Sequence, residues 1–161
     1  MTIQVGDRIP EAKLMQMTPD GPKPLSTGDV FAGKKVVLFA VPGAFTPTCS
    51  ARHLPGFLDR HADFAAKGVD TIACVAVNDA FVMGAWGKSQ EADGKVLMLA
   101  DGNGELTKKL GLELDATGFG MGTRSRRFAL YAEDGVVKVL EVEPGPGLDV
   151  SSAESMLAKI G

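Results

Sequence analysis

Val36-Val-Leu-Phe-Ala-Val41, followed at once by Pro42-Gly-Ala-Phe-Thr-Pro-Thr-Cys-Ser50, is the stretch of the sequence that decides the fold. A continuous apolar run with lysines before it and Pro-Gly after it is typical of a strand buried on both faces of a parallel sheet. Apolar residues at helical spacing follow over Leu54–Ala65. The stretch therefore predicts a strand, a loop and a helix, and in open α/β sheets such a loop is where ligands usually bind.

Strands and helices are expected to alternate outward from this unit. The other expected strands are Val69–Val77, Val96–Ala100 and a hairpin of Arg126–Ala132 with Val136–Val142, and the other expected helices are Phe81–Gln90, Glu105–Leu110 and one that starts at Ser151 with Glu154 completing a capping box. The first thirty residues and the stretch Gly118–Gly122 are predicted to be irregular. This order predicts an α/β protein with a central mixed sheet flanked by helices on both faces. No repeat or linker divides residues 1–161, so a single domain is expected.

Composition excludes several classes of function. The chain has 161 residues, 45% of them hydrophobic, and a formal net charge of −3, which fits a globular protein and argues against binding to nucleic acid. No apolar run approaches the roughly 18 residues of a membrane span, so no membrane association is expected. The first ten residues lack a basic region followed by an apolar one, so the cytoplasm is the expected location.

Cys49 is the first candidate for chemistry. Thr46 suits the N-cap of the following helix and Pro47 its first position, which puts Cys49 in the first turn near unpaired N–H groups. A helix N-terminus or a nearby cation can lower the pKa of a cysteine from about 8.5 to between roughly 3.5 and 7.5, and the thiolate is the nucleophile. Arg124, Arg126 and Arg127 are three candidate cations. The residues alone leave thiol redox chemistry, acyl transfer and a regulatory oxidation open.

The other histidine and cysteine candidates are weaker. His53 lies four residues after Cys49 and could serve as a base for acyl transfer, but a histidine on the helix surface is the favoured interpretation. The chain has only two cysteines, and without companions at ligand spacing they make a poor zinc site. Cys74 lies inside an apolar run, where a buried, inert thiol is expected.

The segment Pro42–Cys49 matches the Pro-x-x-x-Thr-x-x-Cys signature of peroxiredoxins. With the collinear stretches Val77-Asn-Asp-Ala-Phe81 and Gly122-Thr-Arg-Ser-Arg-Arg-Phe128, the chain resembles the peroxiredoxin-5 branch, especially its plant type II members, from about residue 3 to the end. The resemblance implies a thioredoxin-like fold. It also implies a thiol-dependent peroxidase that reduces hydrogen peroxide and alkyl hydroperoxides without metal, flavin or haem.

The resemblance also assigns roles to residues. Cys49 would be the peroxidatic cysteine that attacks the peroxide and becomes a sulfenic acid. Thr46 would hydrogen-bond the sulfur and the peroxide, and Pro42 would shield the thiolate from water. Arg127 would stabilise the thiolate and the transition state, whereas Arg124 and Arg126 are expected to be surface charges.

The sequence departs from part of this branch at its resolving cysteine. Many members carry one near the C-terminus, where this chain has Gly147–Ser152, and no cysteine follows Cys74. A one-cysteine mechanism is therefore expected, with glutathione and glutaredoxin as the first choice of reductant and thioredoxin as the second. Cys74 as a resolving or regulatory thiol is the alternative.

Two further expectations concern partners. The family commonly forms homodimers near its active site, and Phe81–Met83 and Phe119–Met121 are candidates for that interface or, equally, for the core. The alternative to an enzyme is a peroxide sensor or redox-signalling module that uses Cys49 without significant turnover. Intact Pro42, Thr46 and Arg127 favour the enzyme.

Overall fold

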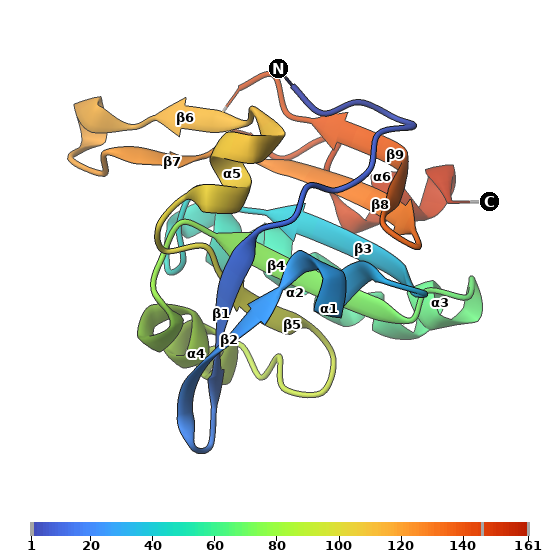
Figure 1. Ribbon diagram of the computed structural model, residues 1–161, viewed down its shortest axis with the longest axis horizontal. Coiled ribbons are helices and arrows are strands. Elements are labelled where there is room, and N and C mark those ends of the chain that lie inside the picture. Colours follow the sequence, from blue (N-terminus) through green and yellow to red (C-terminus); the bar gives the residue numbers. More distant parts are fainter. Residues whose placement is uncertain (1, 146, 161) are drawn as a thin grey trace.

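The apolar run that starts at Val36 forms β3 (Lys35–Ala40), an interior strand of a seven-stranded sheet. In the computed structural model, which describes residues 2–145 and 147–160, β3 pairs in parallel with β4 (Thr71–Ala76) and antiparallel with β8 (Phe128–Glu133). The strand order is β2-β1-β5-β4-β3-β8-β9, so the predicted mixed sheet is confirmed (Figure 1).

The remaining elements complete this sheet and cover it. The strands are β1 (Lys13–Thr18), β2 (Gly21–Ser26), β5 (Leu97–Ala100) and β9 (Val136–Val142), with β6 (Glu113–Asp115) and β7 (Thr123–Ser125) forming a separate ribbon. The α-helices are α1 (Thr27–Phe31), α2 (Leu54–Asp59), α3 (His61–Ala66), α4 (Ala80–Ser89), α5 (Glu105–Leu110) and α6 (Ala153–Lys159). A π-helical turn, η1 (Cys49–His53), precedes α2, and a short 3₁₀ turn, η2 (Thr117–Phe119), joins β6 to β7.

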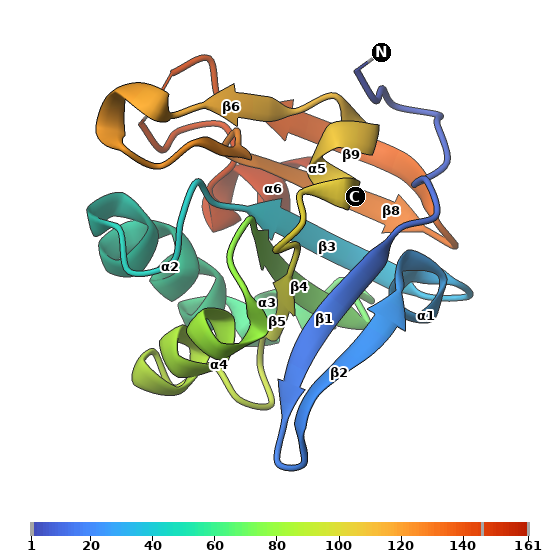
Figure 2. The same cartoon turned by 60° about the vertical axis from the view of Figure 1, so that its left-hand side comes forward.

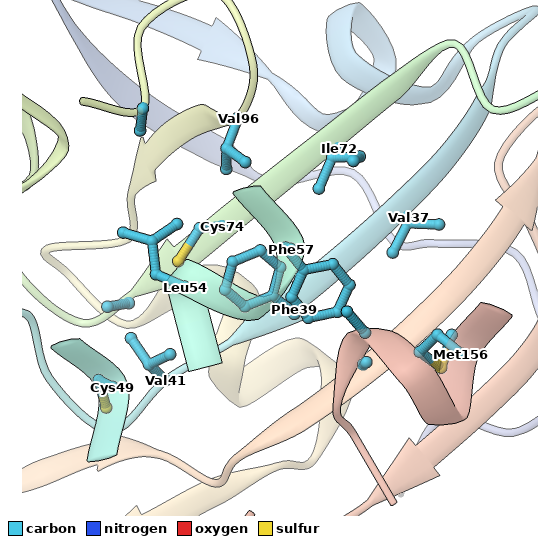
Figure 3. Close-up of a cluster of buried hydrophobic side chains, with 14 of the residues drawn as sticks. Val37, Phe39, Val41, Cys49, Leu54, Phe57, Ile72, Cys74, Val96 and Met156 are labelled. Atoms are coloured by element: carbon cyan, nitrogen blue, oxygen red, sulfur yellow. The ribbon is translucent and has the colours of Figure 1, made fainter. Parts of the chain in front are cut away.

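Both faces of β3 are buried, and each belongs to its own hydrophobic cluster. Val37, Phe39 and Val41 pack with side chains of α2, α3, α4 and α6, and Phe39 stacks on Phe57 of α2 with ring centroids 4.1 Å apart (Figure 3). Alternate residues such as Leu38 pack with α1 and α5 on the opposite face. Helices therefore cover both faces of one sheet, as the alternating pattern predicts (Figures 1 and 2).

The prediction that the first thirty residues are irregular is wrong. They contain the hairpin β1–β2 and the helix α1, and the turn Thr18-Pro-Asp-Gly21 joins the two strands. Pro22 and Pro24 lie in β2, which is an edge strand, and an edge strand tolerates proline because one row of its backbone groups is unpaired. Those prolines remove the alternation by which a strand is recognised in a sequence.

The predicted hairpin near the C-terminus is confirmed. Asp134 and Gly135 join β8 to β9 with φ values of 49° and 79°, the positive φ pair of a type I′ turn. The N-cap of the last helix lies one residue later than predicted, at Ser152, whose hydroxyl oxygen accepts the N–H of Ser155, and the helix begins at Ala153. The expected capping box at Ser151 and Glu154 does not form, and Ser151 is instead buried in contacts described below.

Candidate active site

The loop between β3 and η1 brings Cys49 to the carboxyl end of the sheet. Helical backbone begins at Pro47, as predicted, and passes into the π-helical turn at Cys49, whose carbonyl accepts the N–H of Leu54. The N–H of Ala44 donates to the side-chain oxygen of Asn78 (2.9 Å), which follows β4. Two neighbouring parallel strands thus hold the loop at the edge where α/β proteins bind ligands.

Thr46 lies at the predicted helix start, and its hydroxyl donates to the carbonyl of Gly43 (2.7 Å). The proton of this hydroxyl is thereby committed to the loop, and its oxygen keeps lone pairs for a donor. Pro42 is half-buried in the same loop, and its carbonyl accepts from Nη1 of Arg124 (3.3 Å).

Cys49 is fully buried and lies against a cation. Nη2 of Arg127 donates to its Sγ over 3.2 Å, and Arg127 itself is only 4% exposed. The signature segment and the segment before β8 therefore meet, as the resemblance implied. A guanidinium donor favours the thiolate of a cysteine because it pairs with the charged sulfur.

Arg127 also carries an unused donor. Its Nε is the one buried side-chain nitrogen or oxygen without a hydrogen-bond partner in residues 2–145 and 147–160. Buried polar groups are almost always paired, so a lone donor beside a buried sulfur is a place where a ligand can bind.

His53 is not on the helix surface, and the interpretation that put it there is wrong. It is fully buried, packs against Phe39 with centroids 4.8 Å apart, and contacts Nη1 of Arg127 through Nδ1 (2.8 Å) and the carbonyl of Ser151 through Nε2 (2.9 Å). Burial and then the charge of Arg127 lower the pKa of His53 from 6.5 to about 3, so the ring is neutral. Both ring nitrogens of His53 already have hydrogen-bond partners. His53 is therefore not the general base that acyl transfer by Cys49 would require.

A signal for this histidine was present in the sequence. His53 follows Cys49 by four residues and precedes the buried Leu54 and Phe57, so it shares a helix face with core residues. Polarity alone favoured the surface, whereas the partner that allows its burial, the carbonyl of Ser151, lies 98 residues away.

The other two arginines are not free surface charges. Arg124 is half-buried and donates from Nε to the carbonyl of Met121 (3.0 Å) as well as to Pro42. Arg126 is also half-buried and donates from Nη2 to the carbonyl of Glu143 (3.1 Å). Arg124 and Arg126 therefore stabilise the backbone segments around Cys49 by hydrogen bonds to carbonyl groups.

Cys74 is buried in β4, opposite Phe39, in the same hydrophobic cluster as Cys49 (Figure 3). Burial raises the pKa of the Cys74 thiol, Cys49 raises it further, and Arg127 opposes both. This agrees with the expectation of an unreactive thiol. Within the described part of the chain no cluster of three metal-ligating side chains occurs, and no helix is long and apolar enough to cross a membrane.

A buried cysteine in the first turn of a helix, in contact with an arginine at the carboxyl ends of the parallel strands, is the arrangement expected of a thiol-based redox protein. Comparison with known proteins gives the family. The model of the Redoxin family matches residues 4–157. The chain is 56% identical to peroxiredoxin-2E-2, chloroplastic, of Oryza sativa subsp. japonica, over 97% of this chain and 72% of that one.

Solved structures agree. The reduced Prx3 of Vibrio vulnificus in complex with H₂O₂ superposes with a TM-score of 0.95 at 52% identity, covering 99% of this chain and 100% of that chain. Peroxiredoxin 5 of Alvinella pompejana superposes with a TM-score of 0.86 at 40% identity, covering 98% and 97%. The chain belongs to the Redoxin family and, within it, to the peroxiredoxins, with the thioredoxin-like fold and the kinship to plant type II members that its sequence indicates. Peroxiredoxins are thiol-dependent peroxidases.

Proposed function

We propose that Cys49 is the peroxidatic cysteine of this chain. Its thiolate attacks one oxygen of the peroxide, the S–O bond forms as the O–O bond breaks, and the leaving oxygen takes the electron pair and a proton to become water or an alcohol. The sulfur is oxidised to a sulfenic acid and the peroxide is reduced. The complex of V. vulnificus Prx3 with H₂O₂ supports hydrogen peroxide as a substrate, and alkyl hydroperoxides share the reacting O–O bond.

One observation carries this proposal: Arg127 touches the buried sulfur with Nη2 while its Nε–H stays unpartnered. A donor of this kind stabilises the leaving oxygen, which gains negative charge only as the O–O bond breaks. Thr46 accepts the O–H of the bound peroxide, because its own proton is used by Gly43. Pro42 closes the loop over the sulfur and limits the access of water.

We further propose a one-cysteine mechanism. An external thiol attacks the sulfenic sulfur, releases water and forms a mixed disulfide, and a second thiol then releases Cys49 as the thiol and leaves with the disulfide. The burial of Cys74 and the high pKa of its thiol support this route over an internal disulfide. Glutathione with glutaredoxin is the first choice of reductant and thioredoxin the second.

Steady-state consumption of hydrogen peroxide tests the enzyme. We expect turnover with glutathione and glutaredoxin, less with thioredoxin, and none in a Cys49→Ser variant, whereas Cys74→Ser keeps the wild-type rate. Oxidation of Cys49 without turnover by either reductant would identify a peroxide sensor. Intact-mass measurement after one equivalent of peroxide, without external thiol, tests the one-cysteine mechanism. A decrease by the mass of two hydrogen atoms would indicate an internal disulfide and contradict that mechanism.

We also propose a homodimer and a cytoplasmic location. Phe45, Phe81 and Phe119 are more than half exposed, and aromatic side chains are enriched at protein–protein interfaces. Met83 is buried, so it belongs to the core, whereas Phe81 of the same segment belongs to this surface. The two free cysteines support a reducing compartment such as the cytoplasm. Cell fractionation tests this location. The chloroplast is the alternative, because the name of the rice relative places that protein there.

A further inference from the structure

The side chain of Glu143 is a buried carboxylate that has no part in the chemistry proposed for Cys49. It follows β9, is 3% exposed, and its Oε2 accepts the N–H of Asp149 (2.8 Å) and both the N–H (2.8 Å) and the hydroxyl (2.7 Å) of Ser151. Burial acts to raise its pKa, but the hydrogen bonds from Asp149 and Ser151 outweigh it and hold the pKa of Glu143 below its usual value. An ionised carboxylate therefore fixes the backbone that leads into α6.

The same carboxylate is tied to the active-site arginine through the backbone. The N–H of Glu143 donates to the carbonyl of Arg127 (2.9 Å), and the carbonyl of Glu143 accepts from Arg126. These two hydrogen bonds fix the backbone at Glu143 relative to the backbone at Arg127.

Ser151 begins a chain of contacts that leads from Glu143 through His53 and Arg127 to Cys49. The carbonyl of Ser151 faces Nε2 of His53 (2.9 Å), and because a carbonyl can only accept, Nε2 carries the hydrogen. In a neutral ring Nδ1 is then an acceptor, which is what Nη1 of Arg127 requires at 2.8 Å. The histidine tautomer and the arginine are mutually consistent only while the Ser151 carbonyl stays in place.

A guanidinium is planar, so the bond at one nitrogen sets the direction of the others. When Nη1 is bound to His53, Nη2 lies on Sγ of Cys49 (3.2 Å) and the unpartnered Nε–H is fixed relative to both. Small errors in this orientation matter, because misplacement of a reacting group by about 1 Å can cost about a hundredfold in rate.

We propose that Glu143 is a positioning residue for the reaction at Cys49: it holds the Ser151 carbonyl on His53 and thereby aims Arg127 at the sulfur. The inference rests on the proposed peroxidatic role of Cys49. Glu143 does not contact the sulfur, and it acts on the reaction through three hydrogen-bonded residues, Ser151, His53 and Arg127.

The test compares Glu143→Met, which removes the acceptor at similar size, with Glu143→Gln, which keeps a neutral acceptor. Glu141→Met is the matched control, because Glu141 lies near the end of β9, just before Glu143 in the chain, is partly buried and pairs with Lys159 (2.7 Å) away from the site. The rate of oxidation by hydrogen peroxide is followed in a single turnover by the fluorescence of the single tryptophan, Trp86, so no reductant is required.

We expect Glu143→Met to lose between about ten- and a hundredfold in this rate, Glu143→Gln to lose less, and Glu141→Met to match the wild type. The second readout is the nitrogen NMR spectrum of His53. It shows the neutral Nε2–H tautomer in the wild type and in Glu141→Met, and a mixed or protonated ring in Glu143→Met.

Folded Glu143 variants with wild-type rates, or with an unchanged His53 spectrum, would overturn the proposal. If Glu143→Met does not fold, Glu143→Gln decides by the same two criteria. A wild type that does not react with peroxide contradicts the proposed function instead, and the His53 spectra of the variants then still decide whether Glu143 positions the ring.

Discussion

At the scale of single residues, Arg127 is the side chain whose removal is most informative. Arg127→Gln should lower the second-order rate with hydrogen peroxide by about a hundredfold or more, because a preorganised donor to the developing charge is lost. Arg127→Lys keeps the charge without the planar fork and should recover only part of the rate. Stopped-flow measurement with Arg52→Gln as the control checks this, since Arg52 is an exposed arginine of the neighbouring η1 turn. Equal rates in Arg127→Gln and Arg52→Gln would contradict the assignment.

The sequence pointed to the contact between Cys49 and Arg127 but misplaced the residues that support this pair. Cys49 and Arg127 are 78 residues apart in the sequence and meet as the resemblance implied, whereas the residues alone left Arg124, Arg126 and Arg127 as equal candidates. His53 and Arg124 were assigned to the surface, because a polar side chain is expected outside unless its partners are known. Those partners, the carbonyls of Ser151 and Pro42, are backbone atoms, and no residue letter encodes them.

His53 should make stability depend on pH. Burial and Arg127 lower its pKa from 6.5 to about 3, so between these values the unfolded state binds a proton that the folded state does not. The free energy of unfolding is then fully present above pH 6.5 and falls as the pH is lowered toward 3, with a loss of up to about 4 kcal/mol.

Urea unfolding at several pH values measures this effect. His53→Gln should show a flatter decline than the wild type between pH 6.5 and 4, whereas His61→Gln, which alters a half-buried histidine of α3, should decline in parallel with it. Parallel decline in all three proteins would show that His53 does not titrate as its surroundings require.

At the scale of elements, two glycines of α4 lower its helix propensity and also allow it to pack closely on the sheet. Gly84 and Gly87 are poor helix formers, yet the expected helix forms as α4, because it packs closely on β1 and β5. A Cβ at Gly84 would lie 2.8 Å from Met17, and one at Gly87 would lie 2.8 Å from Met98. Local propensity was outweighed by an approach that only glycine permits, and this contact between distant segments is absent from any local pattern.

Gly87→Ala should therefore destabilise the protein, although alanine is the better helix former. We expect a loss of about 1–3 kcal/mol from overpacking against Met98, larger than the gain of roughly 1 kcal/mol in helix propensity. Lys88→Ala, at an exposed position of the same helix, should change stability by less than about 0.5 kcal/mol. Denaturant midpoints decide the matter, and a more stable Gly87→Ala would refute close packing at this position.

At the scale of the whole molecule, large exposed aromatic side chains occur in three segments: the active-site loop, the start of α4 and the turn between β6 and β7. Phe119 is 87% exposed at η2, Phe81 is 66% exposed at the start of α4, and Phe45 is 55% exposed just before the signature threonine. In Figure 2 the turn between β6 and β7, α2 and α4 lie on the same side of the molecule. Exposed aromatic rings on this side of the molecule are the surface on which the proposed second copy of the chain would pack.

Sedimentation over a range of concentrations tests the homodimer. Burying one phenylalanine contributes about 1.5–3 kcal/mol, so Phe119→Ser and Phe81→Ser should each weaken dimerisation by about ten- to a hundredfold. Val5→Ser is the control, because Val5 is 60% exposed in the N-terminal segment beside β9 and should leave the dissociation constant unchanged. A wild type that is monomeric at all concentrations, or a Val5 variant that dissociates as readily as the two phenylalanine variants, would exclude this interface, and the exposed rings would then have to serve contact with the reductant instead.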